Sequence, residues 1–214
     1  MFAWLWLCPW LALSADSVSS ELEPLPPART KGGRPLMDVL RERESTRDFS
    51  ERPLDREVLS ELLWAAFGVN RPETGQRTAP STMNLRCIDI YVVTAGGTSR
   101  YDAEAHGLVR LGNDDARALT GSQEFVRTAP VALVYVADHA KLGKAPEDER
   151  EFYAAADAGF IGQNVYLYCA SEGLGCVVHM PGDRQGMARA LGLRSEQKIV
   201  LVHSVGYPNV SADD

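Results

Sequence analysis

The chain has 214 residues, which is long enough to bury one sizeable core, and we expect a single domain. Its formal net charge of -7 argues against a nucleic-acid-binding surface, because such surfaces are usually basic. No interior stretch has the roughly 18 uninterrupted apolar residues that a membrane span needs, so we expect no span in the mature chain.

Residues 1–15 carry no charge and form an apolar stretch that ends in the small residues Ser14 and Ala15. This pattern is typical of a secretory leader. Pro9 interrupts the stretch and no Lys or Arg precedes it, so the alternative is an apolar arm packed on the fold. We expect a signal peptide and an exported, periplasmic protein, or a cytoplasmic protein if the leader is not a signal.

Residues 16–34 are rich in Pro and Gly and are interpreted as a linker or arm, which leaves one folded domain over residues 35–210. The first residue of this domain is a proline, which suits the first turn of a helix that leads to the segment 43–47. A second helix is expected between Asp55, as its N-cap, and Gly68, as its stop.

Strands and helices are interleaved in the rest of the chain. The predicted elements are a loop at 70–80, a strand at 88–93, a hairpin of 99–103 and 107–111, a helix at 113–119, a strand buried on both faces at 131–137, a long helix at 147–172, a strand at 176–180, a helix at 183–191 and a last strand at 199–205. This order predicts an α+β or α/β class, with a mixed sheet flanked by helices.

The long predicted helix is rich in small residues between Ala154 and Gly162. Glycine in a helix interior costs roughly 1 kcal/mol relative to alanine. We therefore expect another helix or a flat ligand to approach closely at Gly159 and Gly162.

Four cysteines, Cys8, Cys87, Cys169 and Cys176, become three if the leader is removed, which excludes a fully paired disulfide framework. Cys169 and Cys176 lack metal-ligand spacing with any histidine, so no zinc site is expected. The cysteines are interpreted mostly as small core residues, and a single oxidised pair is the alternative.

The segment Arg43 to Arg47 places two guanidinium groups on either side of Ser45. Arginine presents a planar fork of donors that matches phosphate, and a serine hydroxyl can bind the same oxygens. Basic residues near a helix end also satisfy free carbonyl groups and favour the negative end of the helix dipole. By itself the segment fits a phosphate site and an ordinary helix end equally well.

Familiar catalytic signatures are absent from the sequence. It contains no Gly-x-Gly-x-x-Gly, Walker, His-Glu-x-x-His or Gly-x-Ser-x-Gly motif, and its four histidines are scattered. If the protein is an enzyme, a cofactor is expected to carry the chemistry.

Several short motifs are informative through their common order and spacing. They are Arg43-x-Ser45-x-Arg47-x-Phe49, the helix from Asp55 to Gly68, Arg77-Thr78-Ala79-Pro80-Ser81-x-x-Asn84, Asp157-x-Gly159-x-x-x-Gln163-Asn164, Glu172-Gly173-Leu174-Gly175, Leu191-Gly192-Leu193 and Val205-Gly206-Tyr207-Pro208. Together these motifs resemble the nitroreductase-like flavoproteins over residues 35–208, and they are most similar to the branch that includes azoline-oxidising dehydrogenases.

The resemblance implies a homodimer that binds two FMN molecules at the subunit interface, with the long helix packed against its mate. The residues that it places at FMN are Arg43, Glu44, Ser45, Thr46, Arg47, Ser81, Thr82, Asn84, Met180, Pro181 and Gly182. Arg43 and Ser45 would hold the phosphate, and Arg47 would lie near the ribityl chain and the ring. Asn84 would bind the polar edge of the ring.

Two features depart from the family pattern. Many relatives have basic residues in a C-terminal tail that helps to bind the phosphate, whereas residues 210–214 include none. Relatives often have glycine near position 181, and Pro181 has no N–H to donate to flavin N5.

The function implied by the resemblance is that of an FMN-dependent oxidoreductase. Hydride would pass through flavin N5 to or from a small organic substrate, such as a nitroaromatic or quinone, with NAD(P)H as a candidate electron donor. The alternatives are a dehydrogenase of a peptide or heterocycle and a non-catalytic flavin-binding protein. No catalytic side chain and no metal are expected, because the flavin carries the chemistry.

Overall fold

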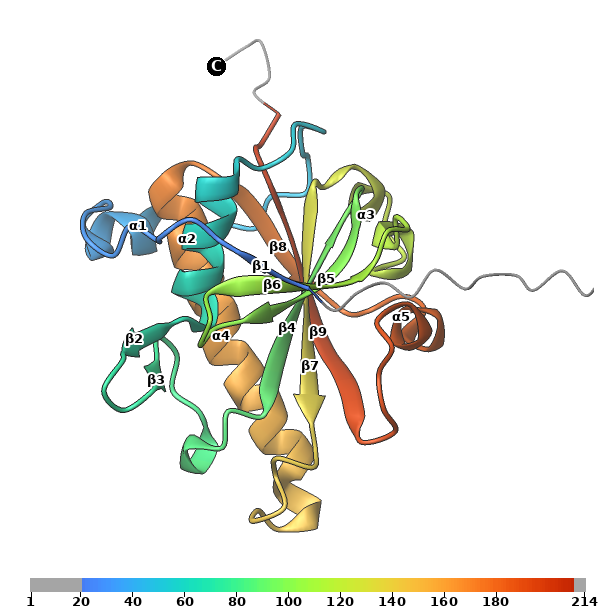
Figure 1. Ribbon diagram of the computed structural model, residues 1–214. Coiled ribbons are helices and arrows are strands. Elements are labelled where there is room, and N and C mark those ends of the chain that lie inside the picture. The colour runs from blue at the N-terminus through green and yellow to red at the C-terminus, as the bar shows by residue number, and fades with distance from the viewer. Residues whose placement is uncertain (1–20, 210–214) are drawn as a thin grey trace, which may run out of the picture.

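The computed structural model describes residues 21–209, which fold around a seven-stranded sheet (Figure 1). The strand order is β1-β6-β5-β4-β7-β9-β8. The strands are β1 Leu22–Pro24, β4 Ile88–Thr94, β5 Gly97–Asp102, β6 Gly107–Gly112, β7 Val131–Asp138, β8 Gly175–His179 and β9 Gln197–Gly206. The predicted leader at 1–15, with Cys8, and the tail at 210–214 lie outside the described residues.

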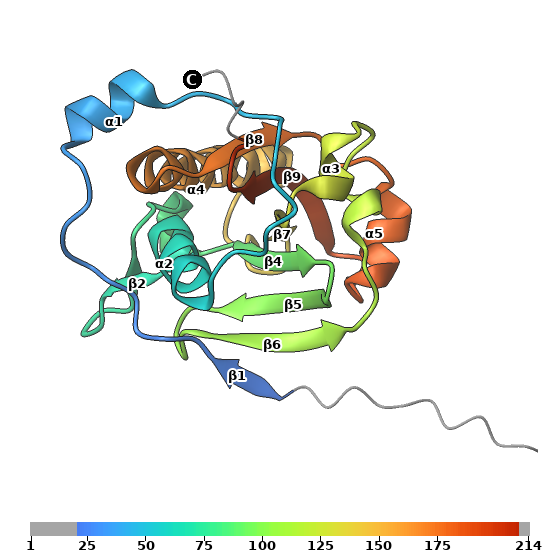
Figure 2. The same ribbon diagram turned by 90° about the horizontal axis from the view of Figure 1, so that it is seen from above.

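Helices pack on both faces of this sheet (Figure 2). The helices are α1 Leu36–Glu42, α2 Arg56–Phe67, α3 Phe125–Thr128, α4 Arg150–Glu172 and α5 Arg184–Ala190, with 3-10 turns at Thr82–Asn84, Arg117–Leu119 and Glu147–Glu149. A small hairpin, β2 Val69–Arg71 and β3 Gln76–Arg77, lies within the loop that the sequence predicts at 70–80. None of the helices within residues 21–209 combines the length and the apolar character that crossing a membrane requires.

The central strand β7 corresponds to the strand that the sequence predicts to be buried on both faces, at residues 131–137. All eight of its residues are buried. Leu133 and Tyr135 belong to the core cluster formed with α2 and α4, and Val134 and Val136 belong to the cluster formed with α5. A strand covered on both faces needs apolar side chains at nearly every position, as the sequence predicts.

The sheet is fully antiparallel, which corrects the expectation of a mixed sheet. All six pairings between its strands are antiparallel. The α4 crossover leaves β8 parallel to β7, but β9 lies between them and pairs antiparallel with both. Interleaved strands and helices usually indicate that neighbouring strands of the sheet are parallel. Here the last strand, β9, lies between the two parallel strands β7 and β8, so they are not neighbours. The α+β class is confirmed.

The helix predicted at 113–119 is also wrong, because only the 3-10 turn at Arg117–Leu119 forms. The Asp115 carboxylate accepts the Arg117 backbone N–H at 3.0 Å and pairs with its guanidinium at 2.8 Å. A local bond from a side chain to the backbone competes with helix formation, and it holds this stretch in a tight turn.

The arm predicted at 16–34 contributes a strand to the sheet. Strand β1 pairs antiparallel with β6 at the sheet edge, and Leu25 is buried. Arg56 of α2 binds the Glu23 carboxylate at 2.6 Å and the Pro24 carbonyl at 2.7 Å. The packed fold therefore begins before residue 35, where the sequence places the domain boundary.

Two glycines of α4 have different surroundings. Gly162 is buried, and a Cβ built there would lie 3.0 Å from Cε1 of His203 on β9. Gly162 therefore lets α4 approach the sheet of its own chain, which corrects the expectation that this glycine serves a dimer mate. Gly159 is exposed, and a Cβ built there would meet nothing within 4 Å.

His203 is enclosed beside Gly162. Its Nδ1 lies 3.0 Å from the Tyr135 hydroxyl, and the Tyr166 ring packs edge-on against it with centroids 4.8 Å apart. Its Nε2 has no hydrogen-bond partner among the described residues. Burial lowers the pKa of His203 to about 3.

We expect the protein to lose stability as the pH falls through the weakly acidic range. Between about 6.5, the pKa of an unfolded histidine, and about 3, the unfolded state binds a proton at His203 that the folded state does not. The free energy of unfolding should therefore decrease by up to about 1.4 kcal/mol per pH unit in this window.

Urea denaturation near neutral pH and about two pH units lower checks this expectation. The variant His203→Gln should lose less stability than the wild type between the two conditions. His139→Gln is the control, because His139 is only half-buried. Equal pH dependence in the wild type and His203→Gln would show that another group is responsible.

Candidate functional site

The predicted phosphate segment, residues 43–47, follows α1 and runs beside β8 at the edge of the sheet. The Thr46 backbone N–H donates to the Cys176 carbonyl of β8, with an N···O distance of 2.9 Å. A Cβ on Gly175 would lie 2.9 Å from Cγ2 of Thr46. Glycine at this position therefore lets the segment lie directly against the strand.

Arg43 and Ser45 converge on Tyr166 of α4. The Ser45 and Tyr166 hydroxyl oxygens are 2.8 Å apart, and the Arg43 guanidinium lies over the Tyr166 ring at 5.2 Å from its centroid. The backbone N–H of Val178 on β8 donates to the same tyrosine hydroxyl at 3.0 Å. Tyr166 therefore ties the two predicted phosphate ligands to both α4 and β8.

Sequence reasoning missed this role for Tyr166. The Tyr168 hydroxyl lies on the other side of α4, 3.1 Å from the Glu61 carboxylate, and takes no part in this contact. Nothing in the sequence links Ser45 to a tyrosine 121 residues away, so only the packing of α4 against β8 reveals the contact.

The guanidinium groups of Arg43 and Arg47 form no ion pair within residues 21–209. The neighbouring Arg41 and Arg52 instead pair with carboxylates three residues away, at 3.1 and 2.8 Å. Two cations without a counter-ion beside an exposed serine hydroxyl are suited to a phosphate dianion. Glu44 is exposed, and its carboxylate forms no ion pair or hydrogen bond within the described part of the chain. The residues present thus fit a phosphate group.

The turn 180–182 follows β8, the strand that Tyr166 and Thr46 contact. The Gly182 backbone N–H donates to the Thr120 carbonyl at 3.2 Å, and a Cβ on Gly182 would lie 2.7 Å from the backbone of Gly121. Met180 is 60% exposed, whereas Pro181 is buried. The turn is therefore held in place and lies at the same end of β8 as Val178.

The second group of predicted ligands lies in the loop 81–86, which is anchored on α4. The Asp157 carboxylate accepts the Thr82 backbone N–H at 2.9 Å and the Thr82 hydroxyl at 3.0 Å. Ser81 Oγ accepts the Arg86 backbone N–H at 2.7 Å. The motif that carries the family resemblance includes Asp157, but the sequence does not show that its role is to hold this loop.

The backbone of this loop is strained. Met83, Asn84 and Arg86 have φ values of 48°, 55° and 50°, a left-handed region that residues other than glycine seldom adopt. Such conformations are kept where the surrounding structure fixes them, and they are frequent at ligand sites. Asn84 is exposed, and its Oδ1 accepts the Arg86 Nε–H at 3.4 Å, while its amide NH₂ has no hydrogen-bond partner within residues 21–209.

The two groups of ligands are not brought together within one chain. Asp157 and Tyr166 are separated by nine residues of α4, which corresponds to about 13 Å along the axis and about 180° around it. The loop 81–84 and the segment 43–47 therefore lie on opposite sides of the helix and at different heights along it (Figure 1).

An exposed face of α4 lies between these two sides. It carries Gly159 and two large apolar side chains, Phe152 and Phe160, which are 72% and 51% exposed. Contiguous apolar residues that remain exposed on a helix often mark a contact with another protein surface. Asp157 and Tyr166, each with its group of ligands, flank this face.

The described thiols are unsuited to nucleophilic chemistry. Cys87, Cys169 and Cys176 are free and buried. Burial and the nearby Asp157 carboxylate raise the pKa of the Cys87 thiol to about 12, so this thiol stays protonated and unreactive near neutral pH.

Comparison with known proteins adds a second line of support. Residues 40–207 match the family model described as the nitroreductase family. A nitroreductase-like protein of Methanocaldococcus jannaschii is 34% identical over 153 residues, which cover 66% of this chain and 76% of that protein.

Solved structures that resemble this chain include proteins described as nitroreductases. The crystal structure of a nitroreductase-like protein from Ralstonia eutropha JMP134 has 42% sequence identity and a TM-score of 0.85, and the match covers 90% of this chain and 92% of that one. An FMN-dependent nitroreductase from Clostridium difficile R20291 shares the fold, at 20% identity and a TM-score of 0.57, over 82% of this chain and 88% of that one.

Proposed function

The chain belongs to the nitroreductase family of oxidoreductases, and from this membership we propose that it is an FMN-dependent homodimer in which each flavin is held by both chains. The observation that carries this proposal is the convergence of Arg43 and Ser45 on Tyr166, together with two guanidinium groups that have no carboxylate partner within residues 21–209.

One chain would hold the phosphate of FMN through its segment 43–47. Arg43 and Ser45 would bind the phosphate oxygens by charge-assisted and neutral hydrogen bonds. Arg47 would place a positive charge beside the ribityl chain and the ring, where it would stabilise negative charge on the reduced flavin. The turn 180–182 would border the ring from the end of β8.

The second chain would supply Ser81, Thr82 and Asn84. Because these residues lie on the opposite side of α4 from Tyr166, one copy alone would have to bend a flavin around its own helix. A two-fold partner packed on the exposed face of α4 would place its own loop beside the segment 43–47 of the first chain, since such an interface is self-complementary.

FMN, when bound, would supply the chemistry of hydride transfer to or from a small organic substrate, with a nitroaromatic or quinone as acceptor and NAD(P)H as donor. The protein side chains would bind and orient the cofactor and adjust its charge. If the predicted leader is a signal, an exported enzyme would depend on an electron donor that is present outside the cytoplasm.

Absorbance and rapid kinetics test this proposal. We expect the purified full chain to be yellow and to release FMN on denaturation, identified by its mass. Mixing the yellow protein with NADH or NADPH in a stopped-flow instrument should bleach the flavin band, and a quinone should restore it. A colourless protein that does not bind added FMN would overturn the cofactor assignment, whereas bound FMN that neither nucleotide reduces would overturn the donor.

A further inference from the structure

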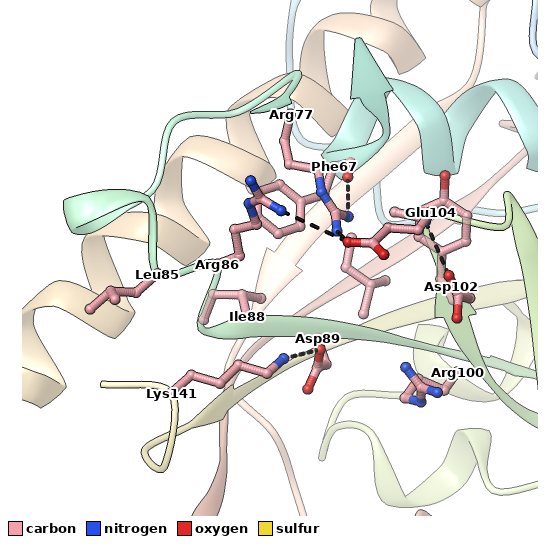
Figure 3. A pocket seen from close by; sticks show the side chains of 13 residues that line it. Phe67, Arg77, Leu85, Arg86, Ile88, Asp89, Arg100, Asp102, Glu104 and Lys141 are labelled. Carbon is pink, nitrogen blue, oxygen red and sulfur yellow. Dashed lines mark hydrogen bonds and ion pairs between the residues drawn. The ribbon is translucent and has the colours of Figure 1, made fainter. Parts of the chain in front are cut away.

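A charged cavity of about 290 Å³ lies between strands β4 and β5 and the segment 77–86 (Figure 3). Its lining includes four cations, Arg77, Arg86, Arg100 and Lys141, and three carboxylates. None of these residues takes part in the flavin site proposed above. The ion pairs and hydrogen bonds of each charged side chain show which charges in the cavity are not compensated.

Two of the three carboxylates are already engaged. Asp89 pairs with Lys141 at 2.7 Å. Asp102 accepts the backbone N–H groups of Glu104 and Ala105, each at 3.0 Å. Of the three, the Glu104 carboxylate is the one that lies within 4 Å of the Arg77 and Arg86 guanidinium groups.

Glu104 contacts Arg77 and Arg86 only loosely. Its Oε1 lies 3.7 Å from Arg77 Nη2 and 3.8 Å from Arg86 Nη1, distances beyond those of hydrogen bonds. Its side chain is 72% exposed. Both guanidinium groups point toward this carboxylate (Figure 3), so one exposed side chain occupies the place where an anion would be held by two forks of donors.

Arg77 is a largely buried cation whose nearest carboxylate, that of Glu104, is 3.7 Å away. Its side chain is only 13% exposed, and its Nε has no hydrogen-bond partner among the described residues. One Nη1 bond, to the Phe67 carbonyl at 3.2 Å, satisfies part of the fork. Burial and the neighbouring Arg86 lower the pKa of Arg77. A buried guanidinium without a close counter-ion is costly, and an anion would relieve that cost.

The remaining cation, Arg100, adds to the excess of positive charge. Its guanidinium forms no ion pair or hydrogen bond within residues 21–209. With Lys141 paired to Asp89, the lining keeps three arginines against two carboxylates, Asp102 and Glu104, which is an excess of one positive charge. The local field therefore favours an added negative charge, although the whole chain is acidic.

We propose that this cavity binds a small molecule through a carboxylate or phosphate group placed between Arg77 and Arg86, where it displaces Glu104. Guanidinium forks match both kinds of oxyanion. A volume near the lower end of the range for ligand pockets, roughly 300 Å³, fits a small metabolite rather than a dinucleotide. The cavity is lined by other residues than the proposed flavin ligands, although Arg86 also bonds two of those ligands, with its Nε on Asn84 Oδ1 at 3.4 Å and its backbone N–H on Ser81 Oγ at 2.7 Å.

Calorimetric titration of the purified full chain with sodium phosphate and with sodium succinate, at matched ionic strength, tests the proposal. We expect saturable binding of at least one of the two, and the preferred probe tells phosphate from carboxylate ligands. Arg86→Gln should weaken this binding about tenfold or more, because a charge-assisted bond is lost. It keeps the backbone N–H that holds Ser81.

Glu104→Gln gives an effect of opposite sign. It removes the competing carboxylate, so binding should become about twofold to fivefold tighter, as expected for release of a surface ion pair. Arg189→Gln, on the exposed surface of α5, is the charge-matched control and should change nothing. The titrations are carried out with FMN-saturated protein, so that the proposed flavin phosphate site at residues 43–47 is occupied and does not contribute to the signal.

The proposal is overturned if neither probe binds beyond a sodium chloride control. It is equally overturned if Arg86→Gln and Glu104→Gln both bind with the affinity of the wild type.

Discussion

Replacing Gly159 with arginine should convert the proposed homodimer into a monomer that does not retain flavin. A Cβ at this position meets nothing within 4 Å in the single chain, and arginine is a better helix former than glycine by up to about 1 kcal/mol. The folded chain itself should therefore tolerate the change. In a dimer packed on α4, the new guanidinium would be buried without a partner, which costs about 3–5 kcal/mol.

Light scattering, the thermal melting curve and the flavin absorbance of the same sample check this prediction. The expected result is a monomer that melts as one cooperative unit and is colourless. The control Gln185→Arg adds the same charge at an exposed position of a different helix, α5. This variant should stay dimeric and yellow. A Gly159→Arg protein that remains a flavin-bound dimer would show that α4 is not the interface.

Arg43→Ala is expected to weaken FMN binding by roughly 10-fold to 150-fold, because one charge-assisted hydrogen bond to the phosphate contributes about 1.5–3 kcal/mol. The variant also loses the contact of the guanidinium with the Tyr166 ring, which should cost about 1 kcal/mol of stability or less. Lower flavin affinity should therefore appear in a protein that still folds.

Fluorescence titration of the flavin-free protein with FMN measures the effect. Arg41→Ala is the matched control, since Arg41 lies two residues earlier on α1 and pairs only with exposed carboxylates. That substitution should leave FMN affinity within about twofold of the wild type. If Arg43→Ala and Arg41→Ala bind FMN equally well, the phosphate is held elsewhere and the role of Ser45 is also in doubt.

Predictions from the sequence agree best with the structure where a short residue pattern determines the type of element. The unbroken apolar run at 131–137 identifies β7 because a strand covered on both faces admits few polar side chains. The same run does not state whether its neighbours are parallel or antiparallel. The position of β9 between β7 and β8 depends on pairing between distant segments, and the prediction of a mixed sheet failed for that reason.

Glycine shows the same limit inside a single helix. The sequence indicates that Gly159 and Gly162 both allow close approach, but it cannot say to what. The structure turns Gly162 toward His203 of the same chain and leaves Gly159 exposed. Three residues of spacing on a helix place them about 60° apart, and the docking of α4 on the sheet decides which of them is covered.

The sequence by itself determined the residue types of the candidate site, because two arginines around a serine and, further along the chain, an asparagine motif are each local features with a fixed spacing. Only the tertiary structure decided which side chains position these residues and on which side of α4 each group lies. Tyr166 and Asp157 are 121 and 75 residues away from the ligands that they position, and the diameter of one helix separates the two halves of the site. Contacts between residues so far apart arise from packing of the whole chain, which no short motif encodes.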